Sequence, residues 1–428
     1  MTEDLFSNHL DLLQAVLAPD HLRRAWQRVK SNQGAPGIDR IAIADFPAHA
    51  KAHWPGIRRQ LEAGDYQPTA VRRVTIPKPS GGERLLGIPT VTDRVIQQAI
   101  AQVLTPIFDP EFSASSFGFR PGRNAHQAVR QVQTTIEAGY RIAVDLDLAK
   151  FFDTVNHDVL RRWLGRRIRD QQLLALIGRY LRAGVLVGEQ VLPSAIGTPQ
   201  GGPRSPLLAN ILLHQLDCEL ERRGHRCARY ADDLLVLVKS QRAGERVKRS
   251  LTRYLGHILK LTVNEAKSKV APVRECAFLS FTFRGKKLRW TEAALADFKH
   301  RVRTLTGRSW GVSMDYRLFK LGQYVRGWMG YFGVSQYYRP IPELDDWLRR
   351  RIRMCYWKQW RLCRTKIRHL RELGVSLKMA IQHAVSSKSY WHMARTPALQ
   401  FAMSNAWLKA QGLVSVRDRW RKAQGYAI

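Results

Sequence analysis

The sequence predicts an α+β fold followed by a helical C-terminal region, and three observations support this prediction. Short strand patterns recur between helix patterns up to about residue 295. From residue 296 onward the composition shifts to 26 Lys/Arg against 7 Asp/Glu, with Trp and Tyr interleaved. The apolar content of 45% indicates a globular chain, and 428 residues suffice for two or three domains.

The first strand pair is predicted after an N-terminal helical region. Residues up to about 60 have helix patterns that a Gly/Pro loop at 33–39 interrupts. A strand is expected at 71–76 and, after a turn, another at 84–88. Lys78 and Arg84 flank this turn, and small residues with nearby positive charge are typical of loops that contact phosphate. Two solvated charges on a loop explain this segment equally well.

Two further loops carry groups suited to nucleotides or template. Residues 197–206 are dense in turn formers before a helix that Ser205 caps, and Gln200 offers an amide to a nucleotide or a template base. The segment 117–123 combines aromatic rings with Arg120 and Arg123, which could contact a template strand. Ordinary turns remain the alternative interpretation of both loops.

Two acidic sites follow predicted strands. Tyr230-Ala231-Asp232-Asp233 is expected to be a tight turn between strands, and the strand 141–144 leads into Asp145 and Asp147. Carboxylates beside apolar strands are costly unless a cation binds them. Although each could be a solvated strand end, together the two sites could hold two Mg²⁺ ions, one activating a 3′-hydroxyl and one steadying pyrophosphate. That arrangement is typical of nucleotidyl transfer.

The charge of the chain restricts its partners. A net charge of +35 with a pI near 10.7 requires a polyanion, for which nucleic acid is the first candidate and an anionic membrane the competitor. No apolar stretch approaches the roughly 20 residues that span a bilayer. The N-terminus begins acidic and lacks a signal-peptide core, so we expect a cytoplasmic protein. Five cysteines without a Cys-x-x-Cys pair disfavour a zinc module and suit a reducing compartment.

The C-terminal region is predicted to contain one long helix over 348–373, ended by Gly374. Before it, a short strand is expected at 278–283. Most of the region's Trp and Tyr rings are expected in the core, but core packing does not require its excess of arginine. Arg-rich helix faces suit structured RNA, which is bound through shape and phosphate contacts. The candidate contacts are Arg349, Arg350, Arg353, Arg361 and Arg364.

Several motifs occur in an order that resembles the reverse transcriptases encoded by bacterial group II introns. They lie at 76–79, 86–89, 116–121, 147–153, 198–202, 230–233, 278–281 and 324–332. The resemblance implies a right-hand polymerase: fingers and a palm with an antiparallel sheet at 1–295, a helical thumb or maturase domain at 296–370, and a DNA-binding region at 371–428.

The resemblance also implies roles for individual residues. Asp147, Asp232 and Asp233 would bind two Mg²⁺ ions, whereas the role of Asp145 stays open because some members have no acid there. Phe152 would reject a ribose 2′-hydroxyl by its bulk. The other implied contacts are Lys78 and Arg84 to the triphosphate, Gln200 in the nucleotide pocket, and Asn264 and Lys267 near nucleotide and primer.

The function implied is an RNA-directed DNA polymerase that is also a maturase. It would bind its own intron RNA, assist splicing, and copy the RNA from a DNA primer with dNTPs, in a bacterial cytoplasm near the nucleoid. The chain ends without the zinc-containing HNH endonuclease of many members and so resembles the compact class C. Arg204 departs from the family, where an apolar residue is usual. A splicing cofactor with a vestigial polymerase site and a reverse transcriptase of host defence remain alternatives.

Overall fold

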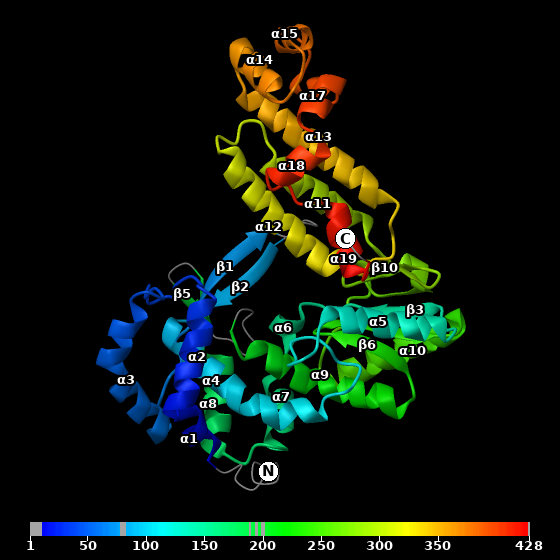
Figure 1. The fold of residues 1–428 in the computed structure, drawn as a ribbon. Coiled ribbons are helices and arrows are strands. Elements are labelled where there is room, and N and C mark those ends of the chain that lie inside the picture. The colour runs from blue at the N-terminus through cyan, green and yellow to red at the C-terminus, as the bar shows by residue number, and fades with distance from the viewer. Residues whose placement is uncertain (1–10, 78–82, 188–189, 193–195, 198–201, 427–428) are drawn as a thin grey trace. The chain divides into compact units, whose positions relative to one another are not determined.

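The computed structural model describes residues 11–77, 83–187, 190–192, 196–197 and 202–426 (Figure 1). The chain divides into two compact units, Met1–Pro272 and Val273–Ile428. Each unit has its own apolar core. The first mixes helices with sheets and the second is mainly helical, which confirms the α+β prediction and the helical C-terminal region.

The first unit is built around a buried helix, α4. Thr90 caps this helix by accepting a hydrogen bond from the amide of Asp93, and its apolar residues, among them Ile96 and Leu104, are inaccessible to solvent. A π-helical turn at Leu255–Leu259 follows α10. The described helices of this unit are α1 (Leu12–Leu17), α2 (Pro19–Ser31), α3 (Phe46–Ala63), α4 (Val91–Phe108), α5 (Ala125–Glu137), α6 (Phe151–Thr154), α7 (His157–Gly165), α8 (Gln171–Arg182), α9 (Ser205–Arg222) and α10 (Gln241–Tyr254).

An antiparallel sheet carries both acidic segments. Its strands are β3 (Ile142–Leu146), β6 (Arg226–Tyr230), β7 (Asp233–Val238) and β8 (Lys269–Pro272), in the order β6-β7-β3-β8. Asp145 pairs with Leu235 on one side and with Lys269 on the other. Helices α5 and α10 pack against this sheet (Figure 1). Because β3 is the central neighbour of β7, the residues that follow β3 emerge beside the turn that precedes β7.

A second sheet in this unit confirms the predicted strand pair. The strands β1 (Val71–Pro77) and β2 (Glu83–Ile88) are antiparallel, and β4 (Val185–Val187) runs parallel to β1 with β5 (Gln190–Leu192) beside it. The predicted turn between β1 and β2 lies outside the described residues, except at its ends.

The second unit begins with a small three-stranded sheet and continues as helices. The strands are β9 (Ala277–Phe278), β10 (Phe281–Arg284) and β11 (Lys287–Trp290). Helices α12, α13 and α19 pack together, and α11 lies against α12. The described helices are α11 (Glu292–Leu305), α12 (Met314–Phe332), α13 (Pro340–Gln359), α14 (Cys363–Glu372), α15 (Leu377–Ala384), α16 (Tyr390–Met393), α17 (Pro397–Ala402), α18 (Asn405–Ala410) and α19 (Val416–Ala423).

The prediction of a single strand at 278–283 is wrong. Leu279 and Ser280 have positive φ values of 51° and 65°, and Phe278 pairs with Phe281 across them. Positive φ at both central residues is what a type I′ hairpin turn requires. The apolar run therefore folds into a hairpin, β9 and β10, although no glycine marks the turn.

The prediction of one helix over 348–373 is also wrong. Helix α13 ends at Gln359 and α14 begins at Cys363. At the break Trp360 is buried, and its ring stacks on His369 with 4.6 Å between centroids. The break lets α14 pack against α15 and α17, whereas Leu362, expected in the core stripe, is exposed. Burial of the Trp360 ring compensates for the interrupted helix.

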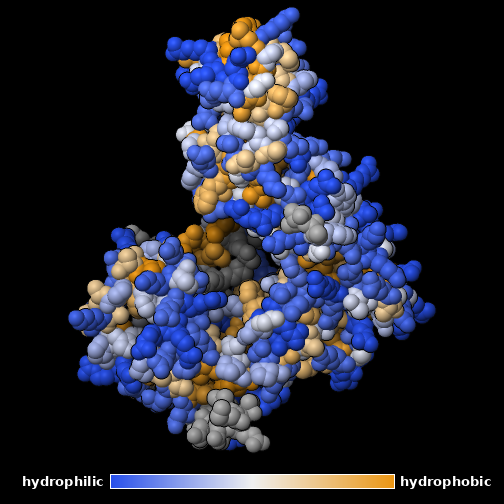
Figure 2. Space-filling view, in the orientation of Figure 1, coloured by the Kyte–Doolittle hydropathy of each residue, from blue (hydrophilic) through white to orange (hydrophobic). Residues whose placement is uncertain are grey.

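The visible surface is largely hydrophilic (Figure 2). Apolar side chains gather over α14, α15 and α17, where the exposed ones include Leu377, Val385 and Phe401. Among the described residues, none of the helices combines the length and apolar character that crossing a bilayer requires.

Candidate active site

Asp232 lies in a strained two-residue turn. Tyr230 pairs with Asp233, so Ala231 and Asp232 alone connect β6 to β7. Ala231 has a φ of 58°, a left-handed conformation that residues with a side chain rarely adopt. Such strain persists only where the surroundings enforce it. The sequence predicted the hairpin correctly but gave no sign of what enforces the turn.

A buried arginine supports this turn from below. Arg229 is 1% exposed and donates to both carboxylate oxygens of Asp217, at 2.8 and 2.5 Å. The same guanidinium donates to the carbonyl of Ala231 at 2.8 Å and to the amide oxygen of Asn210 at 2.9 Å. Ser116 accepts a further hydrogen bond at 2.7 Å. The guanidinium thus joins α9, β6 and the loop before α5 to the turn.

The predicted aromatic loop also packs on the turn. At Gly118 a Cβ atom would clash with the backbone nitrogen of Ala231, so only glycine fits there. The side-chain amide of Asn210 donates to the Gly118 carbonyl at 2.8 Å. The exposed ring of Phe119 lies 6.2 Å from that of Tyr230. This loop therefore positions the turn and leaves one aromatic ring at the surface beside it.

Asp147 is held by the loop before β8. Its backbone amide donates to the hydroxyl of Ser268 at 3.0 Å, and its carbonyl accepts from the amide of Asn264 at 2.8 Å. The carbonyl of Ser268 in turn accepts from the ammonium of Lys248 at 3.0 Å. Ser268 is buried, whereas Lys267 is exposed and Asn264 half-buried. The predicted nucleotide contact at Asn264 thus also braces the chain at Asp147.

The acidic side chains influence one another electrostatically. The pKa of Asp233 is raised to about 6, first by partial burial and then by the charges of Asp232, Asp145 and Asp147. Burial also raises the pKa of Asp145, which Lys269 lowers and Asp147 raises. The register that pairs Asp145 with Leu235 places Asp147, two residues on, across from Asp233. The three predicted metal ligands therefore belong to one electronegative site.

That site is not a closed metal cage. Within the part of the chain that the structure describes, no three His, Cys, Asp or Glu side chains form a group compact enough to hold a metal ion. The donor chemistry nevertheless fits Mg²⁺, which prefers carboxylate oxygens and takes few of them while retaining water and substrate phosphates. Mutual repulsion that raises a carboxyl pKa is also what a bound cation relieves.

Phe152 lies on the short helix α6, which follows Asp147. Its ring is half-buried and lies 5.1 Å from that of the buried Phe151, in an edge-on arrangement. Lys150, which precedes α6, has a positive φ of 46° and turns the chain from β3 into this helix. The neighbouring Phe151 thus anchors α6 in the core while Phe152 remains partly accessible.

The segment after α6 holds Gly197, the first residue of the predicted nucleotide loop at 197–206. Gly197 donates to the carbonyl of Val155 at 2.8 Å, and its own carbonyl accepts from the Nε2 of His157 at 2.6 Å. Its φ is 90°, and a Cβ atom there would lie 2.7 Å from the Asp153 carbonyl oxygen. Burial lowers the pKa of His157, which favours the neutral ring as donor. Sequence reasoning missed His157, because nothing local marks it.

Some predicted nucleotide contacts fall outside what the structure describes. Lys78 and Gln200 lie outside the described residues, and for Arg84 only the backbone in β2 is described, opposite Ile76.

Arg204 is 3% exposed and stacks over the Tyr180 ring at 4.6 Å. Burial lowers the pKa of Arg204 to about 10. The core thus accommodates this unusual arginine by a cation–π contact.

Several predicted nucleic-acid contacts serve the protein itself. Arg120 is turned inward, paired with Asp109 at 2.8 Å and bonded to backbone carbonyls, so its guanidinium is not available to a template. Arg353 is buried and donates to the Met403 carbonyl. These two assignments need correction, because satisfying a buried guanidinium uses the donors that phosphate would need.

The remaining candidates differ in how accessible they are. Arg350 donates to the Trp391 carbonyl, and Arg349 pairs with Asp345 and Asp346. Arg123 donates to the carbonyl of Ala114 and lies over Phe117. Arg361 and Arg364 are exposed, and neither side chain has a hydrogen bond or ion pair with any described residue.

Comparison with known proteins agrees with this arrangement. The family described as "Reverse transcriptase (RNA-dependent DNA polymerase)" matches residues 76–283, which include Asp145, Asp147, Asp232 and Asp233. The family described as "Group II intron, maturase-specific domain" matches residues 295–374.

Individual relatives match parts of the chain. Protein YkfC of Escherichia coli K12 is 32% identical over 317 residues, which are 65% of this chain and 82% of YkfC. The group II intron-encoded protein LtrA of Lactococcus lactis subsp. cremoris is 38% identical over 207 residues, 48% of this chain but 34% of LtrA. A 91 kDa protein in the cob intron of Schizosaccharomyces pombe is 40% identical over 161 residues, 38% of this chain and 20% of that protein. The chain thus spans most of YkfC, about a third of LtrA and a fifth of the cob-intron protein.

Proposed function

The chain belongs to the group II intron reverse transcriptases and maturases, and from this premise we propose that it binds its own intron RNA, assists splicing, and copies the RNA into DNA from a primer. Its enzyme class is RNA-directed DNA polymerase, and its maturase domain belongs to intron splicing. The observation that carries the proposal is the electronegative site formed by the end of β3 and the β6–β7 turn.

The chemistry we propose at this site is nucleotidyl transfer by two Mg²⁺ ions. When bound, the ions would activate the primer 3′-hydroxyl and neutralise the triphosphate. Asp147, Asp232 and Asp233 would hold them, and Asp145, paired in register with Lys269, would add negative charge nearby. The Arg229 network keeps the backbone of the turn fixed, so little reorganisation is needed when substrate arrives.

The domain assignment that accompanies this proposal is a right hand. Fingers and palm would occupy 1–295, the thumb 296–370 and a DNA-binding region 371–428. The antiparallel sheet with its acidic turn supports the palm, and the helices from α11 onward support a thumb.

The proposal is tested by primer extension. The purified chain, with Mg²⁺ and dNTPs, is expected to extend a DNA primer on an RNA template and to accelerate splicing of the intron RNA that carries its reading frame. Extension without any effect on that intron would favour a reverse transcriptase with another role. Splicing help without extension would favour the splicing cofactor with a vestigial polymerase site.

Substituting Phe152 should change sugar selection. We expect Phe152→Ala to increase incorporation of ribonucleotides relative to deoxyribonucleotides by roughly tenfold or more, because the ring's bulk is the proposed barrier to a 2′-hydroxyl and contacts of this size are worth about 1–3 kcal/mol. Competing dNTP and rNTP incorporation on one template measures the ratio. Phe152→Tyr, which keeps the ring, is the control, and an unchanged ratio in Phe152→Ala refutes the assigned role.

His157 should affect nucleotide binding without affecting the acidic site. Because its ring fixes the Gly197 carbonyl beside α6, we expect His157→Ala to raise the KM for dNTP severalfold with a smaller change in kcat. Steady-state extension kinetics separate the two constants. His157→Gln, which retains a side-chain donor, should recover part of the loss, and a purely kcat defect would contradict this role.

RNA affinity should fall steeply with salt. The net charge of +35 implies many phosphate contacts, and each releases condensed counterions. We expect an affinity loss of roughly a thousandfold between 50 and 200 mM salt, as for about six phosphate contacts or more. Fluorescence anisotropy with labelled intron RNA measures it, and a nearly flat salt response would contradict electrostatic binding.

A further inference from the structure

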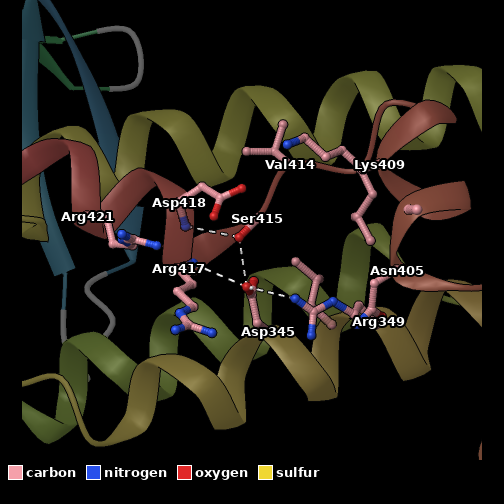
Figure 3. Close-up of a pocket in the computed structure, with 12 residues that line it drawn as sticks. Asp345, Arg349, Asn405, Lys409, Val414, Ser415, Arg417, Asp418 and Arg421 are labelled. Carbon is pink, nitrogen blue, oxygen red and sulfur yellow. Dashed lines mark hydrogen bonds and ion pairs between the residues drawn. The ribbon is translucent and has the colours of Figure 1, made fainter. Parts of the chain in front are cut away.

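Three helices of the second unit enclose a basic pocket (Figure 3). Its volume is about 330 Å³, and its walls come from α13, α18, α19 and the segment that joins the last two. Figure 3 shows Arg349 on α13, Lys409 on α18, and Arg417 and Arg421 on α19 around this space.

One of the two acidic side chains in the pocket, Asp345, already accepts hydrogen bonds from several groups of the protein. Asp345 is 3% exposed and accepts from the hydroxyl of Ser415 at 2.8 Å and the amide of Val416 at 2.6 Å. It also accepts from Arg349 at 3.2 Å and from the backbone amide of Arg417 at 3.3 Å. Its carboxylate therefore caps α19, ties that helix to α13, and has little capacity left for the pocket's other cations.

Three cations remain without compensation. Lys409, Arg417 and Arg421 line the pocket, and their side chains form no ion pair or hydrogen bond with any residue that the structure describes. Arg417 and Arg421 stand one helical turn apart, where like charges repel. Asp418 is the remaining acid in the lining, so the pocket retains an excess of positive charge. A bound anion would relieve this repulsion.

The apolar part of the lining narrows the choice of anion. Leu348 and Leu413 are buried beside the pocket, and Val414 is half-buried. A site with guanidinium forks on one side and apolar surface on another suits a phosphate that carries a sugar and a base. A guanidinium pair also binds the paired oxygens of a phosphodiester better than a point charge does.

We propose that this pocket binds a phosphodiester with its attached nucleoside in a strand of RNA or DNA, through Arg417, Arg421 and Lys409. The inference rests on the proposed function only in one respect, the identity of the bound strand as RNA or DNA. The pocket's positive charge is a property of the second unit alone. The negative charge of Asp418 repels the phosphate and lowers the affinity of the pocket for the strand.

The test compares binding by full-length variants. R417Q/R421Q should bind labelled intron RNA or a single-stranded DNA primer at least roughly tenfold more weakly at low salt, with a slope of log K against log salt smaller by about 1.4–1.8. The control R371Q/K422Q removes two exposed charges outside the pocket lining, one of them on α19. A loss of affinity for RNA alone or for DNA alone identifies the bound strand, and either result supports binding in the pocket. Equal effects of the two double variants would overturn it.

A substitution that is expected to tighten binding distinguishes a change in the pocket from misfolding. Asp418→Asn should tighten binding severalfold, which damage to the fold cannot imitate, and K409Q should weaken it. Weaker or unchanged binding in Asp418→Asn, together with an unchanged K409Q, would contradict the pocket. If the unaltered protein lacked extension while R417Q/R421Q still lost affinity, the polymerase assignment would fail and the pocket would stand.

Discussion

The double substitution Asp232→Asn, Asp233→Asn is expected to reduce primer extension on an RNA template by roughly a thousandfold or more. Asparagine keeps the size of each side chain but removes the charges that would hold the metal ions and neutralise the reacting phosphates. Asp232 is half-buried and Asp233 is exposed at the surface of the turn, and their mutual repulsion disappears on substitution, so the fold should not suffer. Single-turnover extension at saturating primer–template measures the chemical step.

The matched control for this experiment is Asp158→Asn. Asp158 is an exposed carboxylate on α7, outside the electronegative site, and its loss should change extension less than twofold. Affinity for RNA should stay the same or rise slightly in the double variant, because negative charge is removed from a site that faces nucleic acid. Full extension activity in the double variant would refute the assigned site.

Breaking the buried pair of Arg229 and Asp217 should destabilise the first unit by roughly 3–5 kcal/mol. Both side chains are 1% exposed, so Asp217→Ala leaves a buried guanidinium without its bidentate partner. Such a loss is a large part of the 5–15 kcal/mol typical of a domain. Urea denaturation followed by a probe in the first unit measures the change in the free energy of unfolding.

Two controls distinguish the network from a generic effect of charge removal. Asp20→Ala breaks an exposed pair with Arg23 and should cost less than about 1 kcal/mol. A variant in which Arg229 and Asp217 are both replaced by apolar residues should be more stable than Asp217→Ala, since no unpaired charge remains, yet its extension activity should stay low because the Ala231 carbonyl loses its donor. A loss below about 1 kcal/mol in Asp217→Ala would contradict the role given to the pair.

The local motifs were predictable from the sequence because each is a short run on one hairpin or strand end. The β6–β7 turn, the strand that leads to Asp147, and the β1–β2 pair all follow from residue patterns within about ten positions. The proximity of Asp147 to the turn was inferred from the resemblance, and the sheet register accounts for it.

The supporting residues could not be predicted in this way, because their partners are distant in sequence. Arg229 contacts Ser116, and the amide of Asp147 contacts Ser268, across more than a hundred residues in each pair. The same limitation explains the errors. An arginine on a helix pattern has the same sequence signature whether it points outward, as Arg364 does, or into the core, as Arg353 does. The helix break at Trp360 depends on a stacking partner that only the fold provides.

The central claim, that Asp147 and the 232–233 turn bind metal as one site, can be tested most directly by iron-mediated cleavage. Fe²⁺ replaces Mg²⁺ and, with ascorbate and peroxide, cuts the backbone beside the site where it is bound. The account predicts cuts near residue 147 and near 232–233 in the same sample, suppressed by excess Mg²⁺ and lost at both places in Asp147→Asn. Cleavage at one segment only, or cleavage near 232–233 that persists in Asp147→Asn, would contradict it.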